Sequence, residues 1–198
     1  QNLAYFDLLT GNYTLITDHI NWDVEEFALS LDGKQLAVVT NEEGASILRL
    51  VDTRTRVQRV VDLPLGVISG IRWHENGIDL GFSFCSARHQ REAYSLNANT
   101  LNLERWTESG TEATEGLNIA SFVEPEQLRI KSFDDRSIPV FLYRPPPTFS
   151  GKRPVIVDIH GGPEFQFRPE FLESHNYYIN ELGIAMLFPN IRGSSGYG

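Results

Sequence analysis

A repeat in the first half of the chain constrains the fold most. An apolar run that ends at Asp or Asn, with Thr three residues further on, recurs every 45 residues, at Asp7, Asp52 and Asn97. A second pattern, an apolar run that enters a Gly turn, recurs at a spacing of 44, at Gly33 and Gly77. Periods of about 40 to 50 residues built from short strands are typical of β-propeller blades. The repeat therefore predicts propeller blades.

Each repeat unit is predicted to be a series of short strands joined by tight turns. In the first full unit, apolar residues alternate at Phe27, Leu29 and Leu31 before the Asp32-Gly33 turn, and further apolar runs follow. Such sheets bury both faces by stacking, and about two and a half blades are fewer than the usual four to eight. We therefore expect the N-terminus to be truncated. A meander or β-sandwich with a coincident strand spacing stays an alternative.

The repeat pattern fades after Thr100. Residues 108–127 are rich in Ser, Gly, Thr and Glu, and we interpret them as containing a linker. We place the boundary so that residues 1–120 form a partial propeller and residues 121–198 form a second domain. The three tryptophans of the chain are expected to pack between blades rather than to form a stacking surface for ligands; they are Trp22, Trp73 and Trp106.

The second domain is predicted to open with a hairpin. Apolar runs at 128–133 and 138–144 flank a polar turn at 134–137. Three prolines at 145–147 should end the hairpin, because proline has no backbone N–H for the ladder.

A strand, a helix and a second strand are expected next. The apolar runs 155–159 and 184–189 are typical of strands covered on both faces. Between them, Pro169 suits the first turn of a helix and Gly183 suits its end. The apolar stripe of that helix would be Phe171, His175, Tyr178, Ile179 and Leu182. This order predicts a parallel crossover, as at the start of an α/β sheet.

Two Gly-rich loops follow these two predicted strands. The first is His160-Gly161-Gly162-Pro163, and the second is 190–198, Asn-Ile-Arg-Gly-Ser-Ser-Gly-Tyr-Gly. His-Gly-Gly loops are where α/β serine hydrolases build an oxyanion hole. The two loops, about 30 residues apart, resemble the start of the hydrolase domain of prolyl oligopeptidase family serine peptidases. The resemblance is closest to the acylaminoacyl-peptidase and dipeptidyl-aminopeptidase-like branch.

This resemblance implies a mixed fold, in which all-β propeller blades precede the N-terminal part of an α/β-hydrolase domain. It also implies hydrolysis of short peptides through an acyl-enzyme, with a Ser, Asp and His triad. Backbone N–H groups aimed at the developing oxyanion are worth about 2.7 to 4 kcal/mol each. On the family pattern, Gly162 is the expected donor and Gly161 shapes the turn. The alternative is that both glycines serve only a tight turn.

None of the three triad residues is expected in this chain. In α/β hydrolases the catalytic histidine follows the nucleophile, so His160 is expected to orient its loop by hydrogen bonding. Neither Ser194 nor Ser195 has glycine at both flanking positions of a nucleophile elbow. Arg192 is expected to anchor the second loop through ion pairs and hydrogen bonds. We therefore expect the triad downstream of this sequence and no catalysis by the 198-residue chain alone.

Charge and composition restrict the partners. Residues 1–127 hold 9 Lys and Arg against 19 Asp and Glu, and residues 128–198 hold 8 against 7. The acidic first half disfavours nucleic acid and anionic membranes, because phosphate binding needs a basic surface. No apolar run approaches the roughly 18 to 20 residues of a membrane span, so no membrane partner is expected. Short peptides are the expected substrates, and homo-oligomerisation is left open.

Cysteine and histidine usage limits location and cofactors. The single cysteine, Cys85, excludes an intramolecular disulfide and favours the cytoplasm, but a chain that starts at Gln1 leaves a periplasmic or secreted location open. The five histidines show no metal-ligand spacing and no Gly-rich phosphate loop is present. Neither a metal nor another cofactor is expected.

Two other functions stay open at this level. The propeller could be a binding module attached to a degenerate hydrolase remnant. Alternatively, the protein could be a carboxylesterase or lipase, since Gly-Gly oxyanion loops occur there too. A propeller over an active site admits small or extended substrates, which favours a peptidase.

Overall fold

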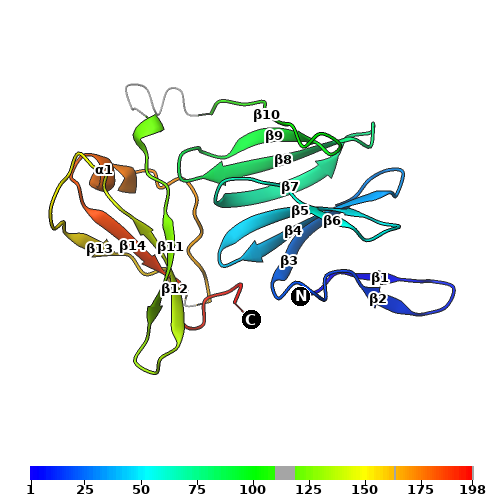
Figure 1. Cartoon of the computed structure of the whole chain (residues 1–198), viewed down its shortest axis with the longest axis horizontal. Coiled ribbons are helices and arrows are strands. Elements are labelled where there is room, and N and C mark those ends of the chain that lie inside the picture. The colour runs from blue at the N-terminus through cyan, green and yellow to red at the C-terminus, as the bar shows by residue number, and fades with distance from the viewer. Residues whose placement is uncertain (110–118, 163, 198) are drawn as a thin grey trace.

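The computed structural model describes residues 1–109, 119–162 and 164–197. Its strands form four sheets: one two-stranded hairpin, two antiparallel four-stranded sheets and one mixed four-stranded sheet (Figure 1). The two antiparallel sheets lie face to face, and the mixed sheet lies beyond their shared end with the short helix beside it. This arrangement agrees with the prediction of partial propeller blades followed by a different type of sheet.

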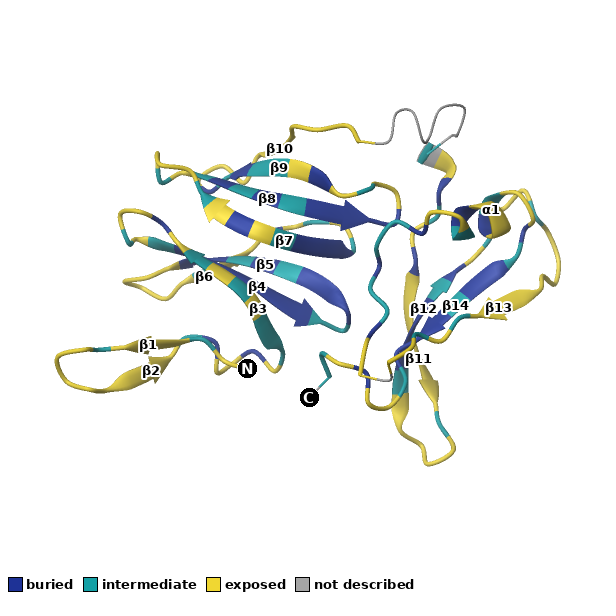
Figure 2. Ribbon diagram, turned by 180° about the vertical axis from the view of Figure 1, so that it is seen from behind, coloured by how far each residue is buried: buried dark blue, intermediate teal, exposed yellow. Residues whose placement is uncertain are grey.

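The two antiparallel sheets are the predicted blades. The first comprises β3 (Asp23–Leu29), β4 (Gln35–Glu42), β5 (Ala45–Asp52) and β6 (Gln58–Val60). The second comprises β7 (Gly66–Trp73), β8 (Asp79–Ser86), β9 (Glu92–Asn97) and β10 (Leu103–Arg105). In both sheets the strands are adjacent in chain order. A hairpin of β1 (Ala4–Phe6) and β2 (Tyr13–Leu15) precedes them and has exposed side chains throughout (Figure 2).

The 45-residue repeat corresponds to one recurring turn. Oδ1 of Asp7, of Asp52 and of Asn97 accepts the backbone N–H groups two and three residues further along the chain. These bonds hold the pKa of the Asp7 and Asp52 carboxyls below the usual value. Four residues after each Asx side chain the backbone has a positive φ, at Gly11, Arg56 and Leu101. Because that conformation is strained for Arg and Leu, the repeated side chain helps to hold the turn.

The blades pack together through one apolar core. Alternate residues of β4 and β5, among them Val39 and Leu48, face residues of β7 to β9 and are fully buried. Polar contacts join the same sheets: the Glu26 carboxylate accepts the N–H groups of Gly70 and Ile71. The Trp73 indole donates to the Ala28 carbonyl of the other blade at 2.9 Å.

The tryptophan prediction is confirmed for Trp73, which packs against the core between the blades. It is wrong for Trp106, which directly follows the edge strand β10 and is 65% exposed. Its indole donates to Ser95 Oγ of neighbouring β9 at 2.8 Å. Trp22 is half-buried and meets the ring of Tyr197 edge-on, so it contacts the second half of the chain.

The mixed sheet has the order β11-β12-β14-β13. Its strands are β11 (Glu126–Lys131), β12 (Ser137–Tyr143), β13 (Val155–Val157) and β14 (Ala185–Pro189). The predicted hairpin is present as β11 and β12, and it ends before the three prolines. Strands β13 and β14 are parallel, and helix α1 (His175–Asn180) lies between them in sequence, which confirms the parallel crossover. A core of Phe141, Tyr143, Ile179 and Phe188 joins the sheet to α1.

One expected strand is less buried than its composition suggests. The side chains of β13 are 53%, 38% and 54% exposed, so the prediction of a strand covered on both faces is wrong. The strand also ends at Val157, two residues before the predicted end at residue 159. β13 is the edge of its sheet and, among the described residues, pairs with β14 alone. The β14 run is buried as predicted, because it has a strand on each side and α1 against it.

The helix is shorter than predicted. It begins after Ser174, because Glu173 has φ 46°, outside the right-handed helical region. Gly183 has φ 63° and follows the helix end, as predicted. Of the predicted stripe, Ile179 is fully buried, whereas Tyr178 and Leu182 are 39% and 42% exposed.

Part of the range 108–127 in which the linker is predicted, residues 110–118, lies outside the described residues. A short 3-10 helix, Ile119–Ser121, precedes β11. The exact domain boundary at residue 120 therefore stays a prediction. In the described part of the chain no helix is long and apolar enough to cross a membrane.

Candidate active site

The two Gly-rich loops leave the same edge of the mixed sheet. One loop follows β13, which ends at Val157, and the other follows β14, which ends at Pro189. Because the two strands are parallel neighbours, their carboxyl ends lie side by side. In α/β sheets this is the edge at which ligands bind.

A hydrogen bond connects the two loops. Nε2 of His160 lies 2.7 Å from Oγ of Ser194, and its Nδ1 lies 3.1 Å from the carbonyl oxygen of Gly161. A carbonyl oxygen can only accept, so in the neutral ring Nδ1 carries the proton and Nε2 accepts from the serine hydroxyl. This is the distance of a base and a nucleophile. However, Ser194 is only 7% exposed, so the pair cannot present its hydroxyl to a substrate.

The two glycines of the first loop are free of close neighbours. Gly162 has φ 109°, a conformation that L side chains rarely adopt, and both Gly161 and Gly162 are exposed. A Cβ on Gly161 would meet nothing within 4 Å, and one on Gly162 would have Phe165 at 3.4 Å. Pro163 lies outside the described residues. The backbone conformation at position 162 therefore favours glycine, and the space beside Gly161 is open.

Arg192 lies on the other side of its loop, toward the β11–β12 turn. Its guanidinium pairs with the Asp134 carboxylate, donates to Ser132 Oγ at 3.2 Å and lies 4.8 Å from the centre of the Phe133 ring. These contacts are suited to anchoring the second loop, and they join it to the β11–β12 turn rather than to His160.

Sequence reasoning missed the residues that join the loops most closely. Asn190, only 2% exposed, acts like an additional strand partner for Phe167. Its Oδ1 accepts the Phe167 N–H at 2.7 Å, and its Nδ2 donates to the Phe167 carbonyl at 3.1 Å and to the Tyr197 hydroxyl at 2.8 Å. Ser195 N–H donates to the Phe165 carbonyl at 3.1 Å. The signal that could have found them is the alternation of aromatic and polar residues over 165–168.

A cavity of about 430 Å³ lies behind the first loop. His160, Phe165, Asp158 and His175 are among its lining residues. Nε2 of His175 lies 3.4 Å from Oδ2 of Asp158, and Glu170 and Glu173 also line this cavity. Among the described residues, no group of three His, Cys, Asp or Glu side chains could hold a metal ion.

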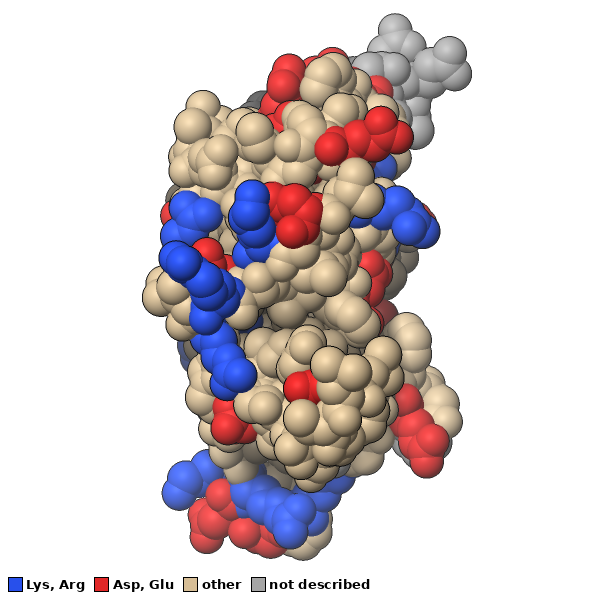
Figure 3. All heavy atoms as spheres, turned by 90° about the vertical axis from the view of Figure 1, so that its right-hand side faces the viewer, with Lys and Arg blue, Asp and Glu red and all other residues tan. Residues whose placement is uncertain are grey.

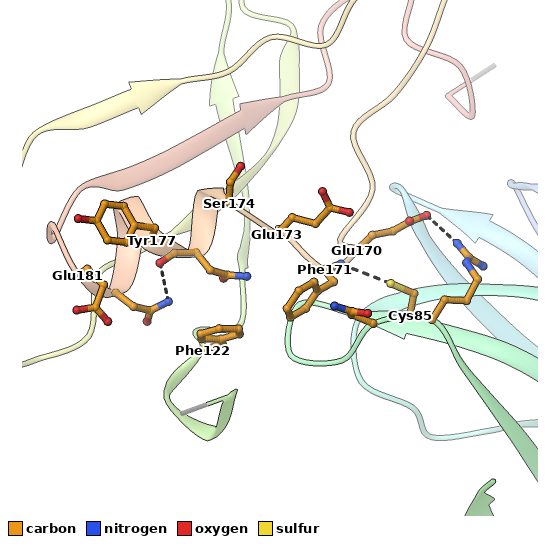
Figure 4. A pocket seen from close by; sticks show the side chains of 12 residues that line it. Cys85, Phe122, Glu170, Phe171, Glu173, Ser174, Tyr177 and Glu181 are labelled. Carbon is orange, nitrogen blue, oxygen red and sulfur yellow. Dashed lines mark hydrogen bonds and ion pairs between the residues drawn. The ribbon is translucent and has the colours of Figure 1, made fainter. Parts of the chain in front are cut away.

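A larger cavity, of about 800 Å³, lies between the second blade and α1 (Figure 4). The labelled rings of Phe122 and Phe171 lie next to each other in its lining, with ring centroids 5.7 Å apart, and Glu170 pairs with Arg91 at 3.3 Å. None of its lining residues belongs to either Gly-rich loop. We therefore place the candidate active site at the loops and not at the larger cavity.

Cys85 lines the larger cavity but is shielded. It is 4% exposed, and burial raises the pKa of its thiol. A raised pKa lowers the fraction of thiolate, the reactive form, at any pH below that value. We expect iodoacetamide at pH 8 to alkylate Cys85 more slowly in the folded chain than in the unfolded chain, because the thiol is buried and its raised pKa leaves less thiolate. Mass spectrometry measures the rate, and the chain unfolded in guanidinium is the control; equal rates in both states would contradict the prediction.

The acidic charge of the first half does not gather into one patch on the face formed by the blade ends. Figure 3 shows Lys and Arg along one margin of that face and Asp and Glu scattered between neutral residues. At least on this face, the charges have the pattern of a solvated surface.

Comparison with solved structures shows the fold. A puromycin-hydrolyzing peptidase from Mycobacterium tuberculosis matches the whole chain with a TM-score of 0.80 and 20% identity, over 31% of its own length. An acylaminoacyl peptidase from Pyrococcus horikoshii matches with a TM-score of 0.73 and 24% identity, over 29% of its length. The chain therefore has the fold of part of these peptidases, and at these identities the match concerns the fold alone.

Sequence comparison finds relatives that are named prolyl oligopeptidase A. Prolyl oligopeptidase A from Galerina marginata is 34% identical over 96 residues, which cover 48% of this chain and 13% of the relative. The corresponding protein from Amanita bisporigera is 32% identical over 96 residues, 12% of its length. No family model matches the chain. The matches span about an eighth of the length of these relatives, and together with the fold they confirm the resemblance to the prolyl oligopeptidase family.

Proposed function

We propose that this chain is part of a serine peptidase of the prolyl oligopeptidase family that hydrolyses short peptides through an acyl-enzyme. The observation that carries the proposal is the position of both Gly-rich loops at the carboxyl ends of the parallel strands β13 and β14. We assign residues 1–120 to a partial propeller and residues 121–198 to the N-terminal part of an α/β-hydrolase domain. We propose the reducing cytoplasm as the location, because the chain has a single cysteine and so cannot form an intramolecular disulfide.

Within this proposal the loop residues stabilise charge and hold geometry. The N–H of Gly162 donates to the oxyanion, and Gly161 shapes the turn that presents it. His160 orients the first loop through Ser194, and Arg192 anchors the second loop through Asp134. The Ser, Asp and His of the triad belong to the remainder of the parent protein. Residues 1–198 alone then lack a nucleophile and should not turn over substrate.

Turnover assays test this proposal. We expect the full-length parent protein to hydrolyse short peptide anilides and to be blocked by a serine-reactive phosphonate, because the phosphonate traps the acyl-transfer nucleophile. The isolated 198-residue chain should show no turnover and no phosphonate label at Ser194, which is buried.

The controls separate the alternatives. Hydrolysis of esters without hydrolysis of anilides would favour a carboxylesterase. No hydrolysis of either by the parent protein would favour a binding module. Phosphonate-sensitive turnover by the isolated chain would contradict a triad outside this sequence.

A further inference from the structure

A buried amide pair joins the first blade to the candidate active-site loops. Asn41, near the end of β4, and Gln166, in the segment after the first loop, are only 4% and 5% exposed. Nδ2 of Asn41 donates to Oε1 of Gln166 at 2.9 Å, and Nε2 of Gln166 donates to the carbonyl oxygen of Ser195 at 2.9 Å. One glutamine amide thus accepts from the blade and donates to the second Gly-rich loop. Its two bonds link parts of the chain that are distant in sequence.

An arginine makes a parallel connection two residues away. Nε of Arg168 donates to the Gly44 carbonyl at 2.9 Å, Nη1 donates to Glu25 Oε1 at 2.9 Å, and Nη2 donates to Ser46 Oγ at 3.0 Å. Glu25 Oε1 also accepts from Asn41 Nδ2 at 2.9 Å. The amide pair and the ion pair therefore share one acceptor. Together they fix residues 166–168 to the β4–β5 turn.

The contact is tightly packed as well as hydrogen-bonded. Gly44 in the β4–β5 turn has φ 93°, and a Cβ there would lie 3.1 Å from the Phe167 carbonyl oxygen and 3.2 Å from the Phe141 ring. A Cβ on Gly196 would overlap Gln166 Nε2 and lie 3.0 Å from Asn41 Nδ2. A small shift of the blade against the loops would therefore break bonds or force clashes, because packed interiors do not deform continuously.

We propose that Gln166 is a positioning residue that couples the first blade to both Gly-rich loops, so that Gly162 attains its working geometry only while the blade is docked. The proposal rests on the proposed peptidase function. A Cβ on Gly161 would meet nothing within 4 Å and one on Gly162 would meet Phe165 and Glu164, so the placement of these glycines depends on the His160–Ser194 bond and on the segments on each side. On one side is β13, and on the other is the segment that Gln166 and Arg168 hold against the blade. Misplacement of a reacting group by about 1 Å can cost about 100-fold in rate.

Two substitutions in the full-length parent protein test the coupling. Gln166→Met has similar volume and removes both hydrogen bonds, so we expect kcat for a peptide anilide to fall about 10- to 100-fold, with KM changed less than about threefold. The matched control is Gln127→Met on β11, where the side chain is exposed, and it should leave both constants unchanged.

Gln166→Glu adds a readout that a merely structural role would not move. A protonated carboxyl can accept from Asn41 and donate to the Ser195 carbonyl, whereas an ionised carboxylate can only accept. Relative to the wild type at each pH, kcat of this variant should be highest at low pH and should fall as the pH rises through the pKa of the new carboxyl. Glu25 and Arg168 are the charged groups bonded to the same cluster, and they shift that pKa upward and downward respectively.

Hydrogen exchange separates this inference from the peptidase function. In Gln166→Met, the amides of Phe167 and Ser195, which donate to Asn190 Oδ1 and to the Phe165 carbonyl, should exchange at least about tenfold faster than in the wild type, whether or not the protein is a peptidase. If the wild-type parent hydrolyses no peptide, the proposed function is refuted and exchange alone decides the coupling. Unchanged exchange at Phe167 and Ser195, or a lowered unfolding midpoint with unchanged kcat at every pH, would overturn the role of Gln166.

Discussion

Replacement of Gly66 by alanine is expected to lower the free energy of unfolding by about 3 kcal/mol, at the upper end of the usual cost of overpacking. Gly66 begins β7, where a Cβ would overlap the carbonyl oxygen of Cys85 and lie 2.6 Å from two ring atoms of Phe84. That carbonyl belongs to the β7–β8 ladder, in which Val67 pairs with Cys85, so it cannot retreat without breaking the sheet. Phe84 is 3% exposed and belongs to the core between the blades.

Gly81→Ala in the same sheet is the matched control. A Cβ at Gly81 would have its nearest atoms at 3.7 Å and 3.9 Å, which is ordinary contact. We expect that substitution to change stability by less than about 0.5 kcal/mol. Urea unfolding followed by tryptophan fluorescence measures both, since Trp73 lies in this sheet. Equal losses for the two variants would show that the blade start tolerates a side chain and would contradict the prediction.

The turns of the blades could be predicted from the sequence because their causes are local. The side chain of Asp52 binds backbone N–H groups only two and three residues away, and Asn97 does the same. Hydrogen bonds over such short spans are encoded within a few residues. The regular spacing of these residues defined the 45-residue repeat, and the repeat predicted the propeller blades.

The burial of side chains could not be predicted in the same way. It depends on which residues distant in the sequence pack against each side chain, and residue composition does not show this. Phe27 and Leu29 alternate as strand residues should, yet they are 59% and 55% exposed and line a cavity together with Tyr5 of β1. The apolar β13 is exposed for the related reason that it lies at a sheet edge. The start of the helix was also not predicted, because glutamate as a residue type does not indicate the positive φ that Glu173 adopts.

In the candidate site, too, local features could be predicted from the sequence and long-range contacts could not. The position of His160, Gly161 and Gly162 after a strand followed from the apolar run and the motif. The partners of that loop did not, because Asn41 and Gln166 are 125 residues apart and meet only in the folded chain. A polar residue in an aromatic segment is a weak signal for a buried amide, and only the structure shows what it bonds.

Asn190→Ala is expected to be the most damaging substitution within the loops themselves, with a loss of about 3 kcal/mol in the free energy of unfolding. The Asn190 side chain makes three hydrogen bonds and is 2% exposed, so alanine would leave the N–H and C=O of Phe167 and the Tyr197 hydroxyl without these partners. Each buried polar group left unpaired costs about 1 to 3 kcal/mol, and water entering the space would recover part of the sum.

Burial raises the pKa of Tyr197, and the bond from Asn190 opposes that rise, so the Tyr197 pKa should move further upward in Asn190→Ala. Spectrophotometric tyrosine titration measures this shift, and thermal unfolding measures the stability. Asn180→Ala is the control, because Asn180 makes one side-chain bond, to the Asn176 carbonyl at 2.9 Å, and should lose less than about 1 kcal/mol. If the two alanine variants unfold at the same temperature, Asn190 does not hold the loops together, and the connection between them depends on the other bonds, from His160 to Ser194 and from Gln166 to Ser195.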